Sequence, residues 1–339
     1  MKFVDRKHEQ ERLTRLLSCD VPAFAIIRGR RRVGKSTLIK RILKEADVYF
    51  EADRTDKETQ MSNLSYVLSH TFPGFNDAQY KDWRALLTAL NHRVTAKITL
   101  CLDEFPYLVE SDSSLPSVIQ NLLDSEELKY NIILCGSSQT MMYNLTHEQS
   151  SPLYGRKEAD FNIRPIKLPF LQEALGLTAE ETIENYAVWG GIPRYWRLRE
   201  SSASLMDSVN EHIMSTMGAL YEEPQSLFQD DFKDIVKTST IMTIVGGGAN
   251  RLKEIAGRCN EPATNLSRPL AKLIDLGYLE KDIPFGVSAK DTKKSLYRIA
   301  DPFLFFHYKF VPANRSFFEL GSTALINGIL ESRLPELTG

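Results

Sequence analysis

The chain has 339 residues, more than a single hydrophobic core usually holds, so two or three domains are expected. Apolar residues make up 42% and charged residues 25% of the chain, which is typical of folded globular proteins and excludes a disordered or fibrous chain. The net charge of -2 does not indicate a partner, because a near-neutral total can include a basic domain.

The N-terminal segment and the cysteines also exclude several classes of protein. The first 17 residues include eight charged side chains, which excludes an apolar signal-peptide core. No apolar stretch approaches the ~20 residues that a membrane-spanning helix needs. The cysteines stand far apart without a CxxC pair, so no zinc knuckle or disulfide framework is indicated (Cys19, Cys101, Cys135 and Cys259). We therefore predict a cytoplasmic protein.

Residues 1–170 alternate short β-rich runs with helix-like stretches, which is typical of a parallel sheet covered by helices. Two of the runs are apolar without alternation, as expected of central strands that are buried on both faces. The pattern predicts an α/β domain with five strands, at 24–28, 48–51, 98–103, 131–137 and 161–168.

The rest of the chain reads as mostly helical. Residues 171–228 show helical periodicity, which predicts a small helical domain, interrupted by the turn Gly190-Gly191-Ile192-Pro193. Residues 229–312 contain three helix-like stretches followed by two extended segments, an order that predicts a winged helix-turn-helix. The helices are expected at 232–245, 252–259 and 263–276, and residues 313–339 are expected to form a C-terminal tail.

A glycine-rich motif lies between the first strand and a helix-like stretch at 37–43. Its glycines let backbone N–H groups approach phosphate oxygens, and the helix N-terminus adds partial positive charge. The motif GxxxxGK[ST] predicts that Lys35 reaches the β- and γ-phosphates of ATP and that the Ser36 hydroxyl ligates Mg2+. The predicted loop consists of Gly29, Arg30, Arg31, Arg32, Val33, Gly34, Lys35 and Ser36, followed by Thr37. The three arginines are equally compatible with contacts to phosphate or nucleic acid and with exposure to solvent.

Two acidic residues end the third predicted strand. Asp103 is expected to hold Mg2+, because carboxylate oxygens suit a hard cation. Glu104 is expected to orient or deprotonate the attacking water. Two acids at a strand end, taken alone, are also compatible with a solvated turn, and the phosphate-binding loop favours the catalytic interpretation.

Two further candidates follow the fourth strand. Ser137 or Ser138 is placed to sense the γ-phosphate, because ligands bind at the carboxyl edge of such sheets. The alternative is that a serine only caps the next helix. Arg156 is a candidate arginine finger that stabilises transition-state charge, with a surface arginine as the alternative.

Together these residues resemble the archaeal-type ATPase family, P-loop proteins related to the STAND branch of the AAA+ ATPases. In such proteins the segment like 3–6 lies near the adenine and the Gly-Ile-Pro turn closes over the nucleotide, so the resemblance implies adenine-side roles for Val4 and Pro193. Many members carry a nuclease-like domain after the winged helix, and we expect residues 313–339 to lead toward such a domain and the domain itself to be missing from this sequence. The resemblance rests on residues 3–6, 28–39, 103–108, 136–138, 151–156, 190–195 and 297–310.

The predicted winged helix is modestly basic. Residues 233–298 contain twelve basic and seven acidic side chains, a net of +5, which leaves DNA binding and internal packing equally open. The polar candidates on its third helix and wing are Thr264, Asn265, Ser267, Arg268, Lys272, Lys290, Lys293 and Lys294.

The sequence as a whole predicts a Mg2+-dependent ATPase in which the nucleotide state, ATP or ADP, drives a rearrangement of domains. DNA, another protein and a second copy of the chain are the candidate partners, and no membrane is involved. The alternative function is an ATP-switched DNA-binding or signalling regulator with little turnover.

Overall fold

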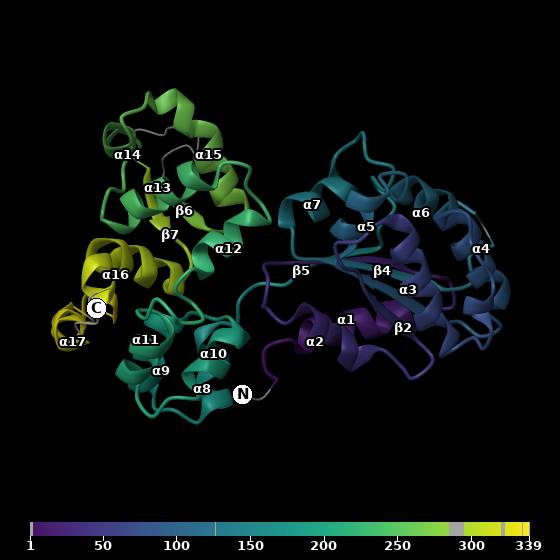
Figure 1. Cartoon of the computed structure of the whole chain (residues 1–339), viewed down its shortest axis with the longest axis horizontal. Helices are drawn as coiled ribbons and strands as arrows, with labels where there is room; N and C mark the ends of the chain where they lie inside the picture. The colour runs from purple at the N-terminus through teal and green to yellow at the C-terminus, as the bar shows by residue number, and fades with distance from the viewer. Residues whose placement is uncertain (1–2, 126, 285–294, 320–322, 334, 339) are drawn as a thin grey trace. The chain divides into compact units, whose positions relative to one another are not determined.

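The computed structural model describes residues 3–125, 127–284, 295–319, 323–333 and 335–338. The chain divides into two compact units (Figure 1). The first, which we name the sheet unit, comprises Arg6–Arg164. The second, which we name the helical unit, comprises Met1–Asp5 and Pro165–Gly339. The chain therefore crosses from one unit to the other twice, after residue 5 and after residue 164.

Five parallel strands in the order β2-β3-β4-β1-β5 form the centre of the sheet unit. Every residue of β3 and β4 is buried, as predicted from their continuous apolar runs. The strands are β1 (Phe24–Arg28), β2 (Val48–Glu51), β3 (Thr99–Asp103), β4 (Asn131–Gly136) and β5 (Ala159–Asn162). The predicted α/β parallel sheet is confirmed.

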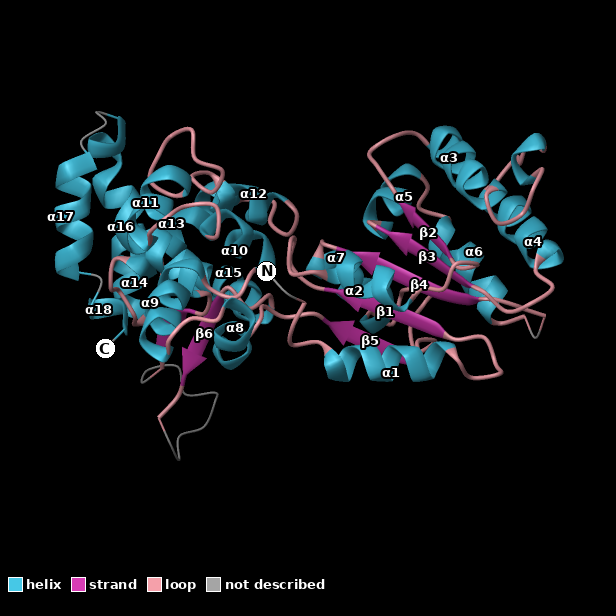
Figure 2. Cartoon of the chain, turned by 90° about the horizontal axis from the view of Figure 1, so that it is seen from below, coloured by secondary structure: helices cyan, strands magenta, loops and turns pink. Residues whose placement is uncertain are grey.

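Helices cover the two faces of this sheet. One face contributes alternate residues such as Ile26, Leu102 and Leu134 to a large core that also includes side chains of α3 to α7. On the opposite side α1 follows the β5 edge, where Arg12 lies 5.6 Å from the ring centre of Phe161 (Figure 2). The helices are α1 (Lys7–Leu17), α2 (Lys35–Ile42), α3 (Lys57–Ser69), α4 (Trp83–Arg93), α5 (Phe105–Ser111), α6 (Leu115–Leu123) and α7 (Gln139–His147), with a 3-10 turn at Phe75–Asp77.

The fifth strand is shorter and begins earlier than predicted. The sequence predicts a strand over 161–168, whereas β5 ends at Asn162. The N–H of Ile163 still bonds to the carbonyl of Arg28 at 2.7 Å. Pro165 has no N–H to offer to a ladder, so the sheet cannot continue through it. The apolar residues after it belong to the helical unit, where α8 begins at Leu168.

Asn131 joins three segments at the amino ends of the strands. Its side chain is buried, and Oδ1 accepts a hydrogen bond from the N–H of Ala23 at 2.9 Å. Its Nδ2 donates to Thr99 Oγ1 and to the carbonyl of Leu17, both at 3.1 Å. One amide side chain therefore ties the end of α1, the start of β1 and the start of β3 together.

Asn131→Ala is expected to lower the free energy of unfolding by about 3 kcal/mol, because two buried groups and one partly buried group lose their hydrogen-bond partner at once. Urea denaturation followed by circular dichroism measures this change. Asn63→Ala, on the exposed side of α3, is the matched control and should cost little. Equal stability of the two variants would contradict the clamping role of Asn131.

The helical unit packs around α16. This helix contacts α9 and α13, and the ring of Phe303 lies 4.6 Å from that of Tyr195. The boundaries predicted at 228 and 312 fall inside α12 and α16. The helices are α8 (Leu168–Leu175), α9 (Ala179–Trp189), α10 (Pro193–Arg199), α11 (Leu205–His212), α12 (Glu223–Gln229), α13 (Ile235–Gly246), α14 (Leu252–Cys259), α15 (Ala263–Asp275), α16 (Pro302–Glu319), α17 (Thr323–Arg333) and α18 (Pro335–Thr338).

Within this unit α13, α14 and α15 are followed by two antiparallel strands, β6 (Leu279–Asp282) and β7 (Leu296–Ile299). This is the order of elements that the sequence predicts for residues 229–312. The predicted wing lysines, Lys290, Lys293 and Lys294, lie outside the described residues. In the described part of the chain, no helix has both the length and the apolar character that crossing a membrane requires.

Candidate functional site

The predicted phosphate loop connects β1 to α2 at the carboxyl edge of the sheet. Its backbone takes positive φ angles at Gly29 (153°), Arg32 (67°) and Gly34 (97°). A Cβ atom at Gly29 would lie 2.3 Å from the carbonyl oxygen of Ile163, so no larger residue fits there without a shift of the backbone. The glycines therefore set the shape of the loop, as the motif predicts.

Lys35 lies inside this loop. Its side chain is only 5% exposed, and Nζ donates to the carbonyls of Gly29 at 2.9 Å and Arg30 at 3.2 Å. The loop carbonyls thus hold the ammonium group inside the loop, whose backbone N–H groups are expected to bind the phosphates. Arg31, Arg32 and Thr37 are exposed, whereas Val33 is buried.

Ser36 and Asp103 come together although they are far apart in the sequence. Ser36 Oγ donates to Asp103 Oδ2 at 2.7 Å, and the N–H of Glu104 donates to Oδ1 at 2.9 Å. Burial by itself raises the pKa of the Asp103 carboxyl group. The hydrogen bonds that it accepts from Cys135, Tyr49 and Ser36 outweigh burial and hold this pKa below its ordinary value. The group is therefore a carboxylate.

These two side chains fit a magnesium ion. A hydroxyl and a carboxylate in contact offer the hard oxygen ligands that Mg2+ prefers. Among the described residues, no group of three or more His, Cys, Asp and Glu side chains could hold a metal by itself. Mg2+ usually takes most of its ligands from water and substrate phosphates. Bound there, Mg2+ would neutralise phosphate charge, with Ser36 and Asp103 as its protein ligands.

Glu104 and Ser137 also meet, across the ends of β3 and β4. Oε2 of Glu104 accepts hydrogen bonds from the Ser137 N–H at 3.2 Å and from its Oγ at 2.9 Å. Glu104 has a φ of 51°, a left-handed conformation that is uncommon for a residue with a Cβ. The neighbouring Ser138 caps α7 by accepting from the N–H of Met141. The capping alternative therefore applies to Ser138, and the sensing role of Ser137 stays a prediction.

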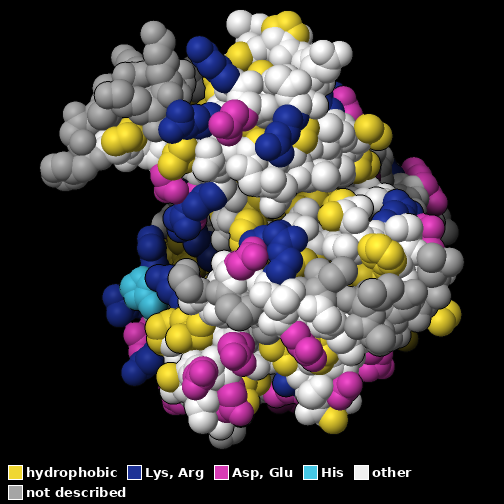
Figure 3. All heavy atoms as spheres, turned by 90° about the vertical axis from the view of Figure 1, so that its left-hand side faces the viewer, with side chains coloured by type: hydrophobic (Ala, Val, Ile, Leu, Met, Phe, Trp, Pro, Cys, Tyr) yellow, Lys and Arg dark blue, Asp and Glu magenta, His cyan; other side chains and the backbone are white. Residues whose placement is uncertain are grey.

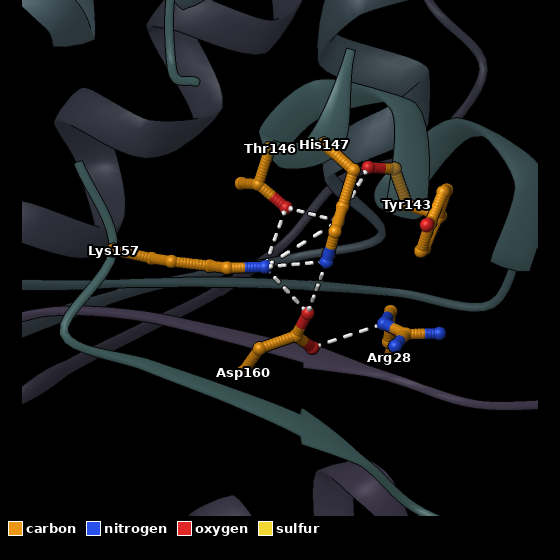
Figure 4. Close-up of polar contacts among 6 residues, drawn as sticks. All are labelled: Arg28, Tyr143, Thr146, His147, Lys157 and Asp160. Carbon is orange, nitrogen blue, oxygen red and sulfur yellow. Dashed lines mark hydrogen bonds and ion pairs between the residues drawn. The ribbon is translucent and has the colours of Figure 1, made fainter. Parts of the chain in front are cut away.

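A polar network holds the end of β1 that enters the phosphate loop (Figure 4). Arg28 Nε donates to Asp160 Oδ1 at 2.9 Å, and its guanidinium lies 5.3 Å from the ring centre of Tyr143. Lys157 Nζ is 2.7 Å from Asp160 Oδ2 and 3.0 Å from Nε2 of His147. The network links β1 and β5 to α7. It therefore stabilises the position of β1, the strand that precedes the phosphate loop, against β5 and α7.

Arg156 lies at the other edge of the sheet from the phosphate loop. Two residues after Arg156, the N–H of Glu158 donates to the carbonyl of Phe24 at the start of β1. The phosphate loop follows the other end of β1, and the two ends of this strand are roughly 13 Å apart. Arg156 forms a two-pronged ion pair with Asp124 at 2.7 and 2.9 Å. A strand length therefore separates Arg156 from the phosphate loop of its own chain, and its role as an arginine finger stays a prediction.

Val4 and Pro193 belong to the helical unit, so their predicted adenine-side roles stay predictions. Pro193 is the first residue of α10, and the preceding turn has a structural cause of its own. A Cβ at Gly191 would lie 2.0 Å from the carbonyl oxygen of Ile166, whose N–H donates to the Gly191 carbonyl at 2.8 Å. The absence of a side chain at Gly191 permits this close approach.

Sequence reasoning assigned no role to Tyr49 or to the side chain of Arg6. Tyr49 Oη donates to Asp103 Oδ2. The buried guanidinium of Arg6 donates to the carbonyls of Arg164 and, at 3.5 Å, of Val33 in the phosphate loop. Neither residue is part of a phosphate-binding motif. For Tyr49, only the register of β2 against β3 could have indicated the contact with Asp103 beforehand.

The chain is similar to several known proteins. The uncharacterized protein MJECL04 of Methanocaldococcus jannaschii is 29% identical over 323 residues, which cover 94% of this chain and 71% of that protein. The structure of Orc2 from Aeropyrum pernix, in ADPNP and ADP complexes, is similar with a TM-score of 0.56 at 14% identity, over 97% of this chain and 95% of that one. Cdc6p from Pyrobaculum aerophilum gives 0.43 at 12% identity, over 97% and 94%.

At this identity the likeness to Orc2 shows the fold alone, which is that of an AAA+ P-loop protein. The sequence match is more specific. The family described as an ATPase domain predominantly from Archaea matches residues 3–197, which include the phosphate loop and the acidic pair at the end of β3. This stretch is more than half of the chain. The chain therefore belongs to the family of ATPase domains found predominantly in Archaea.

Proposed function

We propose that this chain binds Mg–ATP and hydrolyses it to ADP and phosphate. The observation that carries the proposal is the contact of Ser36 Oγ with Asp103 Oδ2 at 2.7 Å, beside a loop that encloses Lys35. In this proposal Lys35 and the loop N–H groups bind the phosphates, and Ser36 and Asp103 hold the cation. Glu104 accepts the proton of the attacking water.

We further propose that the nucleotide state changes how the two units are arranged. The contacts of Arg6 support this. Arg6 directly follows the first crossing of the chain, and its guanidinium donates hydrogen bonds to the carbonyl of Arg164, at the second crossing, and to the carbonyl of Val33 in the phosphate loop. A change in the loop on nucleotide binding would thus reach both crossings directly. An arginine finger at Arg156 would act only on the nucleotide of a second copy, because it lies at the far edge of its own sheet.

A regulator with little turnover is the second candidate function, and one observation favours it. Both donors of Ser137 bond to one oxygen of the Glu104 carboxylate, Oε2, and hydrogen bonds to a carboxylate make it a weaker base toward water. In this alternative the protein binds ATP tightly, and hydrolysis resets it slowly. Ser137 then controls how often Glu104 is released.

DNA is a candidate partner of the winged helix that we assign to residues 229–312. Thr264, Asn265, Ser267 and Arg268 are exposed on α15, as a recognition helix requires. Lys272 is different, because its Nζ donates to the carbonyl of Asp231 and lies 4.9 Å from the ring centre of Phe232. On the face drawn in Figure 3, the described Lys and Arg side chains lie interspersed with acidic and hydrophobic ones rather than in one continuous patch.

The steady-state rate of phosphate release, with and without duplex DNA, separates the two functions. The enzyme proposal predicts Mg2+-dependent turnover of about 1 per second or more, within the usual range of enzymes. The regulator predicts tight Mg–ATP binding with turnover slower by orders of magnitude. Chelation of Mg2+ by EDTA should abolish turnover in either case. Absence of both binding and turnover in the presence of Mg2+ would refute the proposed function.

A further inference from the structure

Tyr49 on β2 donates a hydrogen bond to the carboxylate that we assign to Mg2+, yet it lies outside the phosphate loop and the acidic pair. Its Oη and Ser36 Oγ both donate to Oδ2 of Asp103. A carboxylate has no proton to donate when it is ionised, so the Tyr49 hydroxyl is the donor in this contact.

The strand register explains how a residue on a neighbouring strand reaches this carboxylate. In the β2–β3 ladder Glu51 is opposite Asp103, and Tyr49 is opposite Cys101. Residues two apart on a strand lie on the same face, so Tyr49 lies on the face of Asp103. Two residues along a strand span about 7 Å, a length that a phenol side chain covers. The edge strand therefore delivers a hydroxyl to the end of β3.

The tyrosine ring is held in place from α2. Lys40 Nζ lies 4.3 Å from the ring centre of Tyr49, a cation–π geometry. Lys40 and Ser36 are four residues apart on α2, so they lie on the same side of that helix. One face of α2 thus fixes both the serine that meets Asp103 and the tyrosine ring beside it.

The donors around Asp103 fill the carboxylate. Ser36 and Tyr49 donate to Oδ2, the N–H of Glu104 donates to Oδ1, and the Cys135 thiol donates as well. An ionised carboxylate has about four lone-pair sites, so these four donors occupy them. A cation that binds this carboxylate would therefore compete with one of these donors. Ser36 is the donor expected to give way, because its oxygen is itself the second expected ligand, and the other three donors can stay.

We propose that Tyr49 is a positioning residue for Mg2+, which orients the Asp103 carboxylate toward the cation after Ser36 turns from Asp103 to the metal. The proposal rests on the proposed Mg–ATP site. Of the three donors that stay, one is a backbone N–H and one is a thiol, which is a weak donor. Tyr49 therefore contributes the strongest side-chain bond that fixes the carboxylate. Such indirect partners of a metal typically alter its affinity 10- to 100-fold.

Tyr49→Phe tests this proposal, because it keeps the ring and its contact with Lys40 and removes only the hydroxyl. Isothermal titration with the non-hydrolysable analogue adenylyl imidodiphosphate, over a series of Mg2+ concentrations, measures the half-saturating Mg2+. We expect this concentration to rise about 10-fold or more in the variant. Affinity for the analogue in EDTA should stay near that of the wild type, and circular dichroism without Mg2+ establishes that the variant is folded.

Tyr80→Phe is the matched control, since it also removes one tyrosine hydroxyl. The Tyr80 hydroxyl donates to the carbonyl of Phe75, with a length of 2.8 Å, and does not contact the Asp103 carboxylate. It should leave the Mg2+ dependence unchanged. An unchanged half-saturating Mg2+ in Tyr49→Phe would overturn the proposal. A lowered one would also overturn it, because Tyr49 would then compete with the cation. A wild type whose nucleotide binding is absent or independent of Mg2+ would refute the proposed site itself, and the inference with it.

Discussion

Lys35→Ala is expected to reduce the affinity for Mg–ATP about 100-fold or more. The substitution removes a buried ammonium that the loop carbonyls of Gly29 and Arg30 hold in position. Hydrogen bonds to charged groups contribute about 1.5–3 kcal/mol each, and Lys35 is expected to make at least two to phosphate oxygens. Equilibrium binding of a fluorescent ATP analogue in the presence of Mg2+ measures the loss.

Lys44→Ala is the control for Lys35→Ala. Lys44 is exposed just beyond the C-terminal end of α2, so its removal changes the net charge equally without altering the loop. It should bind the analogue as the wild type does. Circular dichroism establishes that both variants are folded. Near-equal affinities of Lys35→Ala and the wild type would show that the nucleotide does not bind in this loop.

Glu104→Gln is expected to retain Mg–ATP binding and to lower the turnover rate about 100- to 10,000-fold. The amide keeps the size of the carboxylate but cannot accept a proton from water, and general-base catalysis typically accounts for a factor of this size. The amide oxygen can still accept the hydrogen bonds that Ser137 donates to Glu104. Binding and single-turnover hydrolysis, measured on the same preparation, separate the two effects.

Glu110→Gln is the matched control, because Glu110 is exposed on α5, the helix that begins directly after Glu104. The same chemical change there should leave turnover intact. Hydrolysis by Glu104→Gln at the wild-type rate would assign the base to another group. If turnover falls only together with nucleotide affinity, Glu104 serves binding rather than proton transfer.

The sequence by itself determined the local features of this protein. The continuous apolar runs of β3 and β4 identify central strands, since a strand buried on both faces has no polar side. The glycine-rich loop is local as well, because its positive φ angles at Gly29 and Gly34 depend on the absence of a Cβ. The roles proposed for Lys35 and Asp103 could likewise be predicted, because Lys35 is part of the loop motif that precedes α2 and Asp103 ends an apolar strand.

Only the tertiary structure decided which distant side chains meet. The register of β2 against β3 places Tyr49 beside Asp103, and the hydrogen-bonded order of β3 and β4 joins Ser137 to Glu104. The length of β1 separates Arg156 from the phosphate loop of its own chain. These outcomes depend on strand pairing between segments far apart in the sequence, whereas periodicity and motifs report only on neighbouring residues. Turn glycines and apolar runs are local constraints, and strand register is a property of the whole sheet.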